Sequence, residues 1–277
     1  VDLNHSIRAT ADLAAIATSD VILAVPPAQH LRGVMSKFAR YLAADVPVVI
    51  CSKGIEQETG RFMGDVLEEV APQVQRAVLT GPSFAADVAR GLPSALTLAC
   101  RNEAVGRGLA AALSSRQMRL YWSSDVIGAE LGGAVKNVLA IAAGIVEGRG
   151  LGTSAHAAIV TRGFSELRRF GEAMGARPET LLGLSGLGDL ILTCGSTQSR
   201  NMSLGRALGE GRTLAEILGG RSAVTEGVYT AAALVRLARD KGVEMPIAEA
   251  VHSIIEGRLG VDEAITGLMQ RPLKAED

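Results

Sequence analysis

The chain has 277 residues, of which 48% are apolar and 21% are charged, and its formal net charge is -1. This is the profile of a globular protein with room for two domains, and it lacks the basic bias that a nucleic-acid-binding protein normally shows. One Trp, three Tyr and five Phe also leave few platforms on which bases could stack.

The mean hydropathy of +0.25 raises the question of a membrane span. The most apolar stretch, residues 137–146, has only ten residues, whereas a spanning helix needs about 20, so we expect a buried core and no membrane span. No secretory signal is expected at the first residues. Cys51, Cys100 and Cys194 are odd in number and far apart, and the four histidines lack metal-ligand spacing. These features predict a cytoplasmic location and no metal site.

The first half of the chain alternates helical and strand patterns. Thr10 is a suitable N-cap for a first short helix. The next segment, residues 20–25, is continuously apolar and stops at Pro26 and Pro27, which is typical of a buried parallel strand. In chain order we expect helices at 11–17, 29–42, 60–71 and 103–114, and strands at 20–25, 47–51, 77–80, 94–99 and 118–122.

After Trp122 the strand pattern stops and only helical patterns follow. They cover residues 124–147, 154–174, 200–208, 224–241 and 245–256. Alternating strands and helices predict βαβ units in a doubly wound parallel sheet, so the fold class is α/β and Rossmann-like, followed by an all-helical second domain. We expect a dinucleotide-binding domain at 1–123 and a helical substrate and catalytic domain at 124–277.

The glycine-rich turn that opens most dinucleotide-binding sheets does not occur near the start of this sequence. Its nearest echo, Gly186-Leu-Gly188, lies in the helical half and follows no strand. We therefore expect the first βαβ unit to be missing from this chain. The residues that distinguish NAD from NADP would belong to that unit.

Two polar segments follow predicted strands, where the ligand crevice of such sheets lies. Lys53 comes directly after the strand at 47–51, and its ammonium suits a phosphate or a polarised carbonyl; a surface lysine in a turn is the alternative. Gly81 permits close backbone approach after the next strand, and Ser83 is either a donor to substrate or a helix cap.

The helix at 124–147 carries a single lysine among small side chains. Gly132, Lys136, Ala140 and Ala143 share one face at 3.6 residues per turn. Such a face can lie against a ring or a small substrate, and burial of Lys136 would lower its pKa toward the range of a general base. Tight helix packing, with the lysine reaching solvent, is the alternative.

Two further segments of the helical half suggest an anion site. Asp189 stands alone in an apolar stretch and needs a cation, for which Lys136 is a candidate; a cap or a structural ion pair is equally consistent. Ser199 is a suitable N-cap, with Arg200 and Asn201 in the first turn behind it. A helix start beside an arginine favours phosphate, although capped surface helices are common.

Taken together, these segments resemble bacterial-type NAD(P)-dependent sn-glycerol-3-phosphate dehydrogenase over essentially the whole chain. The matching pieces are Lys-Gly-Ile-Glu at 53–56, Gly-Pro-Ser-Phe-Ala at 81–85, Glu-Leu-Gly-Gly-Ala-Val-Lys-Asn at 130–137, Gly-Leu-Gly-Asp-Leu at 186–190, Ser-Arg-Asn at 199–201 and Val-Thr-Glu-Gly at 224–227. Each piece is weak evidence, whereas six in the same order and spacing are strong.

The resemblance implies a role for each matching residue. Lys136 is the general base that takes the C2 hydroxyl proton of glycerol 3-phosphate, giving dihydroxyacetone phosphate. The residues implied to bind substrate are Lys53, Gly81, Ser83, Lys136, Asp189, Ser199, Arg200 and Asn201. The residues implied to bind NAD or NADP are Lys53, Ala85, Arg200, Val224 and Glu226. The family also implies a homodimer and a role in phospholipid synthesis.

Two other readings remain open. Enzymes of the 6-phosphogluconate and β-hydroxyacid dehydrogenase group combine similar domains with a helix-borne lysine. Their helix typically carries an asparagine four residues after the lysine, where this chain has Ala140, with Asn137 adjacent to the lysine instead. A non-catalytic dinucleotide-binding protein is the second alternative, and the set of Lys136, Asp189 and Arg200 argues against it.

Overall fold

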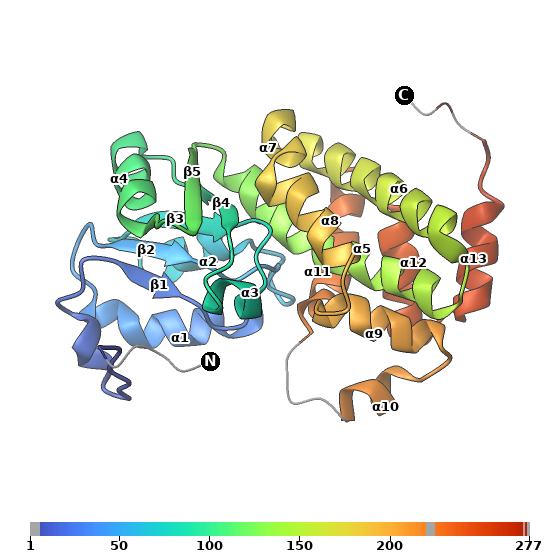
Figure 1. The fold of residues 1–277 in the computed structure, drawn as a ribbon, viewed down its shortest axis with the longest axis horizontal. Helices are drawn as coiled ribbons and strands as arrows, with labels where there is room; N and C mark the ends of the chain where they lie inside the picture. The colour runs from blue at the N-terminus through green and yellow to red at the C-terminus, as the bar shows by residue number, and fades with distance from the viewer. Residues whose placement is uncertain (1–5, 220–224, 274, 276–277) are drawn as a thin grey trace.

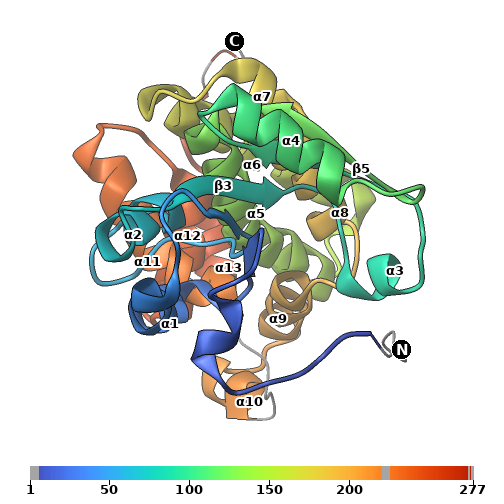
Figure 2. The same ribbon diagram turned by 90° about the vertical axis from the view of Figure 1, so that its left-hand side faces the viewer.

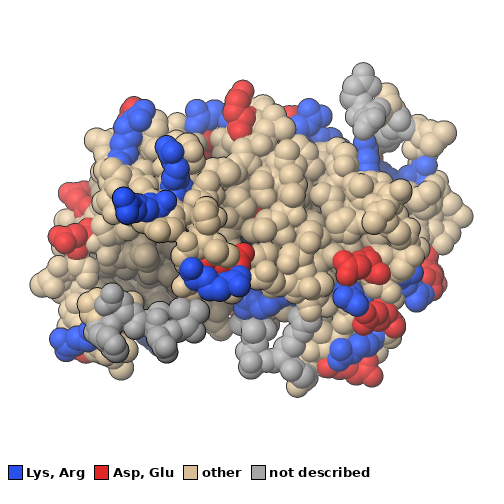
Figure 3. Space-filling model, in the orientation of Figure 1, with Lys and Arg blue, Asp and Glu red and all other residues tan. Residues whose placement is uncertain are grey.

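A computed structural model describes residues 6–219, 225–273 and 275 of the chain. In Figure 1 the strands gather in one half of the molecule and the longer helices in the other, and Figure 2 turns the strand half toward the viewer. Charges of both signs are dispersed over the face drawn in Figure 3. The two halves meet along α5 (Val126–Gly148), which starts beside the sheet and runs through the helical half.

The sheet has five strands in the order β1-β2-β3-β4-β5. They are β1 (Ile22–Ala24), β2 (Pro47–Ile50), β3 (Gln75–Thr80), β4 (Ser94–Ala99) and β5 (Met118–Ser123). All five lie where the sequence predicts strands. Three neighbouring pairs are parallel, and β3 and β4 are antiparallel.

The antiparallel pair corrects the expectation of an all-parallel sheet. The connection between β3 and β4 contains only α3 (Ala85–Ala89), a helix of five residues. Such a helix is about 7.5 Å long, whereas a six-residue strand is about 20 Å long. The connection is therefore too short to run back along the sheet face. Strand β4 starts at the end of the sheet where β3 stops and runs in the opposite direction.

Helices cover both faces of this sheet, as the doubly wound class requires. On one face α1 (Leu31–Phe38) and α2 (Met63–Val70) pack on side chains of β2 and β3. On the other face α4 (Glu103–Leu113) packs on Val49 of β2 and Leu98 of β4. The predicted fold class is confirmed.

The amino-terminal elements differ from the expected ones in detail. The helix predicted at 11–17 is a 3-10 turn at Leu13–Ile16, capped by Asp12 rather than by Thr10. The helix predicted at 29–42 is α1 flanked by two 3-10 turns. Strand β1 has one neighbour among the described strands, and Leu23 is 49% exposed, so the expected full burial of this strand is wrong.

The five predicted helices of the second half are all present, with ends that differ by a few residues. In chain order the elements are α5, α6 (Gly152–Ala173), α7 (Pro178–Leu182), a π-helical turn (Leu184–Gly188), α8 (Asp189–Cys194), α9 (Arg200–Gly209), α10 (Leu214–Gly219), α11 (Glu226–Asp240), α12 (Pro246–Ile255) and α13 (Val261–Met269). The sequence patterns gave no indication of the short helices α7, α8 and α10, of the π-helical turn or of α13.

The glycines of α5 serve helix packing rather than approach of a ligand. A Cβ on Gly132 would lie 2.3 Å from the carbonyl oxygen of Ser185, and one on Gly144 would lie 2.2 Å from that of Met202. The α5 backbone therefore rests directly on the π-helical turn and on α9. The expectation that the face containing Gly132 meets a substrate ring is wrong at that position.

Helix α5 is also long and apolar enough to cross a membrane by length and composition alone. The ten most apolar residues, 137–146, are only part of this apolar helix. In the structure 83% of the relevant window is buried inside the protein, where α5 packs against α6, α8, α9 and α11. The helix is therefore the centre of the core, as the composition predicts.

Candidate active site

Lys136 lies on the buried part of α5, where only 7% of the residue is exposed. Its Nζ donates to Oδ1 of Asp189 at 2.5 Å and to Oγ1 of Thr193 at 2.9 Å. Burial, followed by the charge of Lys53, lowers the pKa of Lys136 to about 8, although Asp189 opposes the shift. An amine with this pKa can both accept and donate a proton near neutral pH.

Asp189 is 1% exposed, and its carboxylate accepts hydrogen bonds from two lysines. Its Oδ2 accepts from Nζ of Lys53 at 2.7 Å, and the same ammonium donates to the carbonyl oxygen of Gly81 at 2.9 Å. The predicted contact between Asp189 and Lys136 is confirmed, and Lys53 shares the carboxylate. Two ammonium groups against one carboxylate leave a net positive charge, which suits a negatively charged ligand.

Local structure explains why the Asp189 carboxylate lies beside Lys136. It is the first residue of α8 and follows the π-helical turn directly. Thr193 lies one helical turn later and donates to the backbone carbonyl of Asp189 at 2.6 Å, so both side chains face Lys136. Thr193 is a site residue that the sequence did not predict. Its spacing of four residues from Asp189 is a signal only where the segment is known to be helical.

The segment after β3 lies beside Lys53. Gly81 has a φ of +132°, and a Cβ there would lie 3.1 Å from the Cα of Leu96 on the neighbouring strand, so glycine is required for this turn. Ser83 Oγ donates to the carbonyl oxygen of Gly81 at 3.3 Å. Ala85 is the first residue of α3 and is exposed.

The start of α9 shows the predicted cap. Ser199 Oγ accepts from the backbone N–H of Met202 at 3.2 Å. Asn201 is buried, and both ends of its amide have protein partners: Nδ2 donates to Oδ1 of Asn137, and Oδ1 accepts from the N–H of Gly227, each at 2.9 Å. Asn201 therefore connects α5, α9 and α11.

Asn137 extends this network to the sheet half. Its Nδ2 donates to the carbonyl oxygen of Lys53 at 3.0 Å. Asn137 is adjacent to Lys136 on α5. The network therefore joins the backbone of Lys53 to the helix that carries Lys136. The sequence predicted no contact for Asn137.

Arg200 and Glu226 lie at the starts of α9 and α11. Arg200 is exposed in the first turn of its helix. Glu226 Oε1 accepts from the N–H of Ala28, in the segment after β1, at 2.9 Å. Burial raises the pKa of Glu226, while its bond with Ala28 and the charge of Arg200 lower it. Val224 lies outside the described residues.

A doubly wound sheet joined to a helical bundle, with a buried lysine and aspartate where the two meet, defines the class of two-domain, dinucleotide-dependent dehydrogenases. Comparison with known proteins specifies the family. The sequence profile of the NAD-dependent glycerol-3-phosphate dehydrogenase N-terminus matches residues 1–106, and that of the C-terminus matches residues 125–266. The chain belongs to the NAD-dependent glycerol-3-phosphate dehydrogenase family.

Individual relatives agree with this assignment. The chain is 60% identical to the glycerol-3-phosphate dehydrogenase [NAD(P)+] of Parvibaculum lavamentivorans over 276 residues, which is 100% of the chain and 83% of the relative. It is 58% identical to the enzyme of the same name from Caulobacter vibrioides, with the same coverage. The crystal structure of glycerol-3-phosphate dehydrogenase from Coxiella burnetii superimposes with a TM-score of 0.92 at 37% identity, covering 97% of this chain and 82% of that one.

Proposed function

We propose that the protein interconverts sn-glycerol 3-phosphate and dihydroxyacetone phosphate with NAD or NADP. The observation that carries this proposal is the buried Lys136, held by Asp189 and Thr193 at the meeting point of the two halves. The family assignment supports this reading over a hydroxyacid dehydrogenase or a non-catalytic binding protein.

Lys136 is the proposed proton carrier. Two of the three positions around its Nζ are taken by Asp189 and Thr193, which leaves the third for the C2 oxygen of the substrate. During oxidation the neutral amine takes the hydroxyl proton as C2 becomes a carbonyl, and during reduction the ammonium returns it. Because its pKa is lowered to about 8, both forms of Lys136 exist near neutral pH.

The remaining substrate contacts are proposed from position and charge. Lys53, Gly81 and Ser83 line the sheet side of the site, and Asp189 orients both lysines. Arg200 supplies a charged fork for the substrate phosphate at the start of α9, beside the Ser199 cap and Asn201. Asn201 belongs to the same proposed phosphate site, where its amide is held by Asn137 and Gly227.

The residues near the end of β1 fit a nicotinamide dinucleotide. Oε2 of Glu226 is buried and has no hydrogen-bond partner within the described part of the chain. Such an oxygen needs a donor, and the hydroxyl and amide groups of a dinucleotide are suitable donors. The residues that would hold the cofactor are Lys53, Ala85, Arg200, Val224 and Glu226. When bound, the nicotinamide ring accepts or supplies the hydride.

We further propose the wider setting of the reaction. Residues 1–123 are the dinucleotide-binding domain and residues 124–277 the substrate domain, and two copies form a homodimer in the cytoplasm. The product in the reducing direction would supply phospholipid synthesis. Light scattering coupled to size-exclusion chromatography tests the dimer, and a mass of one protomer across the working concentration range would refute it.

The activity itself is tested on the full-length gene product by following the near-ultraviolet absorbance of reduced nicotinamide. Glycerol 3-phosphate and dihydroxyacetone phosphate should be turned over in opposite directions, and short hydroxyacids should not. Turnover of a hydroxyacid without turnover of glycerol 3-phosphate would favour the β-hydroxyacid dehydrogenase reading. Binding of cofactor without any turnover would favour a binding protein.

A further inference from the structure

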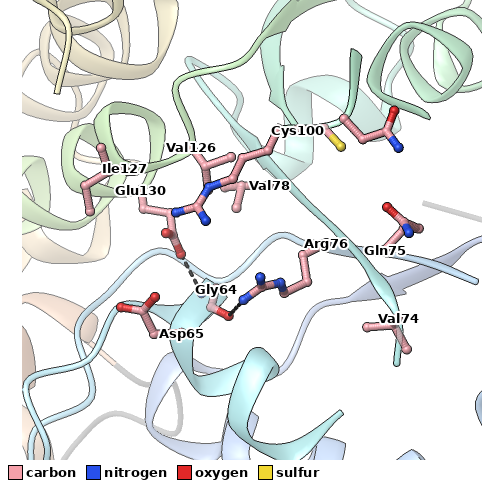
Figure 4. A pocket seen from close by; sticks show the side chains of 12 residues that line it. Gly64, Asp65, Val74, Gln75, Arg76, Val78, Cys100, Val126, Ile127 and Glu130 are labelled. Carbon is pink, nitrogen blue, oxygen red and sulfur yellow. Dashed lines mark hydrogen bonds between the residues drawn. The ribbon is translucent and has the colours of Figure 1, made fainter. Parts of the chain in front are cut away.

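Glu130 lies on α5 six residues before Lys136, and no step described above uses it. Its Oε1 accepts from the backbone N–H of Gly64, in the first turn of α2, at 2.6 Å. Figure 4 shows this bond beside the one that Arg76 donates to the carbonyl oxygen of Gly64. Phe62, the N-cap residue of α2, provides no side-chain cap. Glu130 therefore caps α2 from a different helix and a different half of the molecule.

Glu130 belongs to the face of α5 that docks on the sheet half. Glu130, Gly133 and Asn137 are spaced i, i+3 and i+7 and so share one side of the helix. A Cβ on Gly133 would lie 2.8 Å from Oγ1 of Thr80 and 3.4 Å from Cγ of Lys53. Asn137 donates to the carbonyl oxygen of Lys53 at 3.0 Å. This face therefore touches the start of α2, the end of β3 and the Lys53 segment.

Backbone contacts hold together the segment between Lys53 and α2. Ile55 and Phe62 form an isolated antiparallel bridge, and the N–H of Glu56 donates to the carbonyl oxygen of Arg61 at 2.9 Å. Ile55 and Phe62 are 0% and 2% exposed and belong to the core of the helical half. These contacts connect the start of α2 to the residues directly after Lys53. We therefore expect a shift at the start of α2 to displace Lys53 as well.

The surroundings of Glu130 give it no role in proton transfer to substrate. It lines a pocket of about 270 Å³ together with Asp65 from α2, Arg76 from β3 and Arg101 from the segment after β4. Burial raises the pKa of Glu130 to about 7, while the bond from Gly64 and the two arginines oppose the shift. The carboxylate is directed at the start of α2, where it accepts from the Gly64 N–H.

We propose that Glu130 is a positioning residue: by holding the start of α2 on α5, it keeps the ammonium of Lys53 in contact with Asp189 and close to Lys136. This inference rests on the function proposed above. The group that Glu130 positions, Lys53, donates to Asp189 at 2.7 Å.

Two substitutions in the full-length gene product separate the possible roles. Glu130→Ala removes the acceptor for the Gly64 N–H, whereas Glu130→Gln keeps an oxygen in the same place. We expect kcat for glycerol 3-phosphate oxidation to fall about tenfold or more in Glu130→Ala, because small misplacements of catalytic groups are costly. Glu130→Gln should retain most of the wild-type kcat.

The pH profile provides a readout that simple destabilisation would not move. The charged or titratable groups around Lys136 are Lys53, Asp189 and Cys194, and the charge of Lys53 lowers the pKa of Lys136. If Lys53 moves away, the pKa of Lys136 rises. The increase of kcat with pH should therefore shift to more alkaline pH in Glu130→Ala and remain in place in Glu130→Gln.

Glu68→Gln is the matched control. Glu68 is a carboxylate on α2 itself and pairs with Arg76 at 2.5 Å, but it is largely exposed and accepts no bond from the Gly64 N–H. This variant should keep the wild-type kcat and pH profile. Hydrogen exchange of the Gly64 amide gives a measurement independent of activity, and we expect faster exchange only in Glu130→Ala.

Three results would overturn the inference: an unchanged kcat in Glu130→Ala, a reduced kcat with an unmoved pH profile, or equal losses in Glu130→Ala and Glu130→Gln. Absence of glycerol 3-phosphate turnover in the wild-type protein would instead refute the proposed function. In that case the exchange of the Gly64 amide still reports whether Glu130 caps α2.

Discussion

Replacing Asp189 with Asn tests the central feature of the site, one carboxylate shared by two lysines. Asp189 contacts Lys136 at 2.5 Å and Lys53 at 2.7 Å. Removing its charge leaves two ammonium groups facing each other in a buried site. Both the lost attraction and the remaining repulsion disfavour the charged form of Lys136, so its pKa should fall below the present value of about 8.

The magnitude follows from the lost interaction. A hydrogen bond between charged groups contributes about 1.5–3 kcal/mol, and one pKa unit corresponds to about 1.4 kcal/mol. Loss of the Asp189 contact should therefore lower the pKa of Lys136 by about one to two units, to about 6–7. In the proposed mechanism the neutral amine is the active form in oxidation, so the rise of kcat with pH should move to more acidic pH by the same amount.

The assay measures kcat for glycerol 3-phosphate oxidation across pH in the wild type and in Asp189→Asn. The plateau should also fall, on the order of 10²-fold or more, because Lys136 loses the group that orients it. Asp262→Asn is a suitable control, since Asp262 is 73% exposed and pairs with Arg149 far from the site. A pH profile that stays in place or moves to alkaline pH would refute the assignment of the titrating group.

Five other variants test separate parts of the structure. Lys136→Met should reduce turnover on the order of 10²–10⁴-fold with little change in cofactor affinity measured by fluorescence titration; retained turnover would exclude the lysine as base. Thr193→Val should lower kcat about tenfold through loss of one hydrogen bond to Lys136, and Thr193→Ser should restore it. Gly144→Ala should destabilise the protein by about 1–3 kcal/mol in denaturant unfolding, because a Cβ there would lie 2.2 Å from a backbone oxygen. Gly108→Ala, where a Cβ meets nothing within 4 Å, should stabilise it by about 0.5–1 kcal/mol, and equal effects of the two glycine variants would contradict the packing argument.

The lowered pKa of Lys136 also predicts opposite pH dependence for the two directions of the reaction. In the proposed mechanism oxidation needs the neutral amine of Lys136 and should increase as pH rises through about 8, whereas reduction needs its ammonium and should decrease over the same range. Rates measured in both directions on one preparation test this. Parallel profiles would indicate that a group other than Lys136 controls the proton.

Much of the fold was determined by local sequence patterns. Apolar runs bounded by turn residues placed all five strands, and helical periodicity placed α5 and the four other long helices of the second half. Ser199 was recognisable as a cap because capping depends on a side chain and an amide three residues away. These features need only near neighbours in the chain, so the sequence contains the information for them directly.

Only the tertiary structure decided how the pieces combine. Lys53 meets Asp189 across 136 residues of sequence, and no local pattern specifies that pairing. The antiparallel β3–β4 pair, the use of Gly132 for helix packing and the bond from the Gly64 N–H of α2 to Glu130 of α5 also depend on which surfaces meet. The lowered pKa of Lys136 has the same origin, because the cost of a charge depends on the atoms packed around it rather than on its neighbours in the chain.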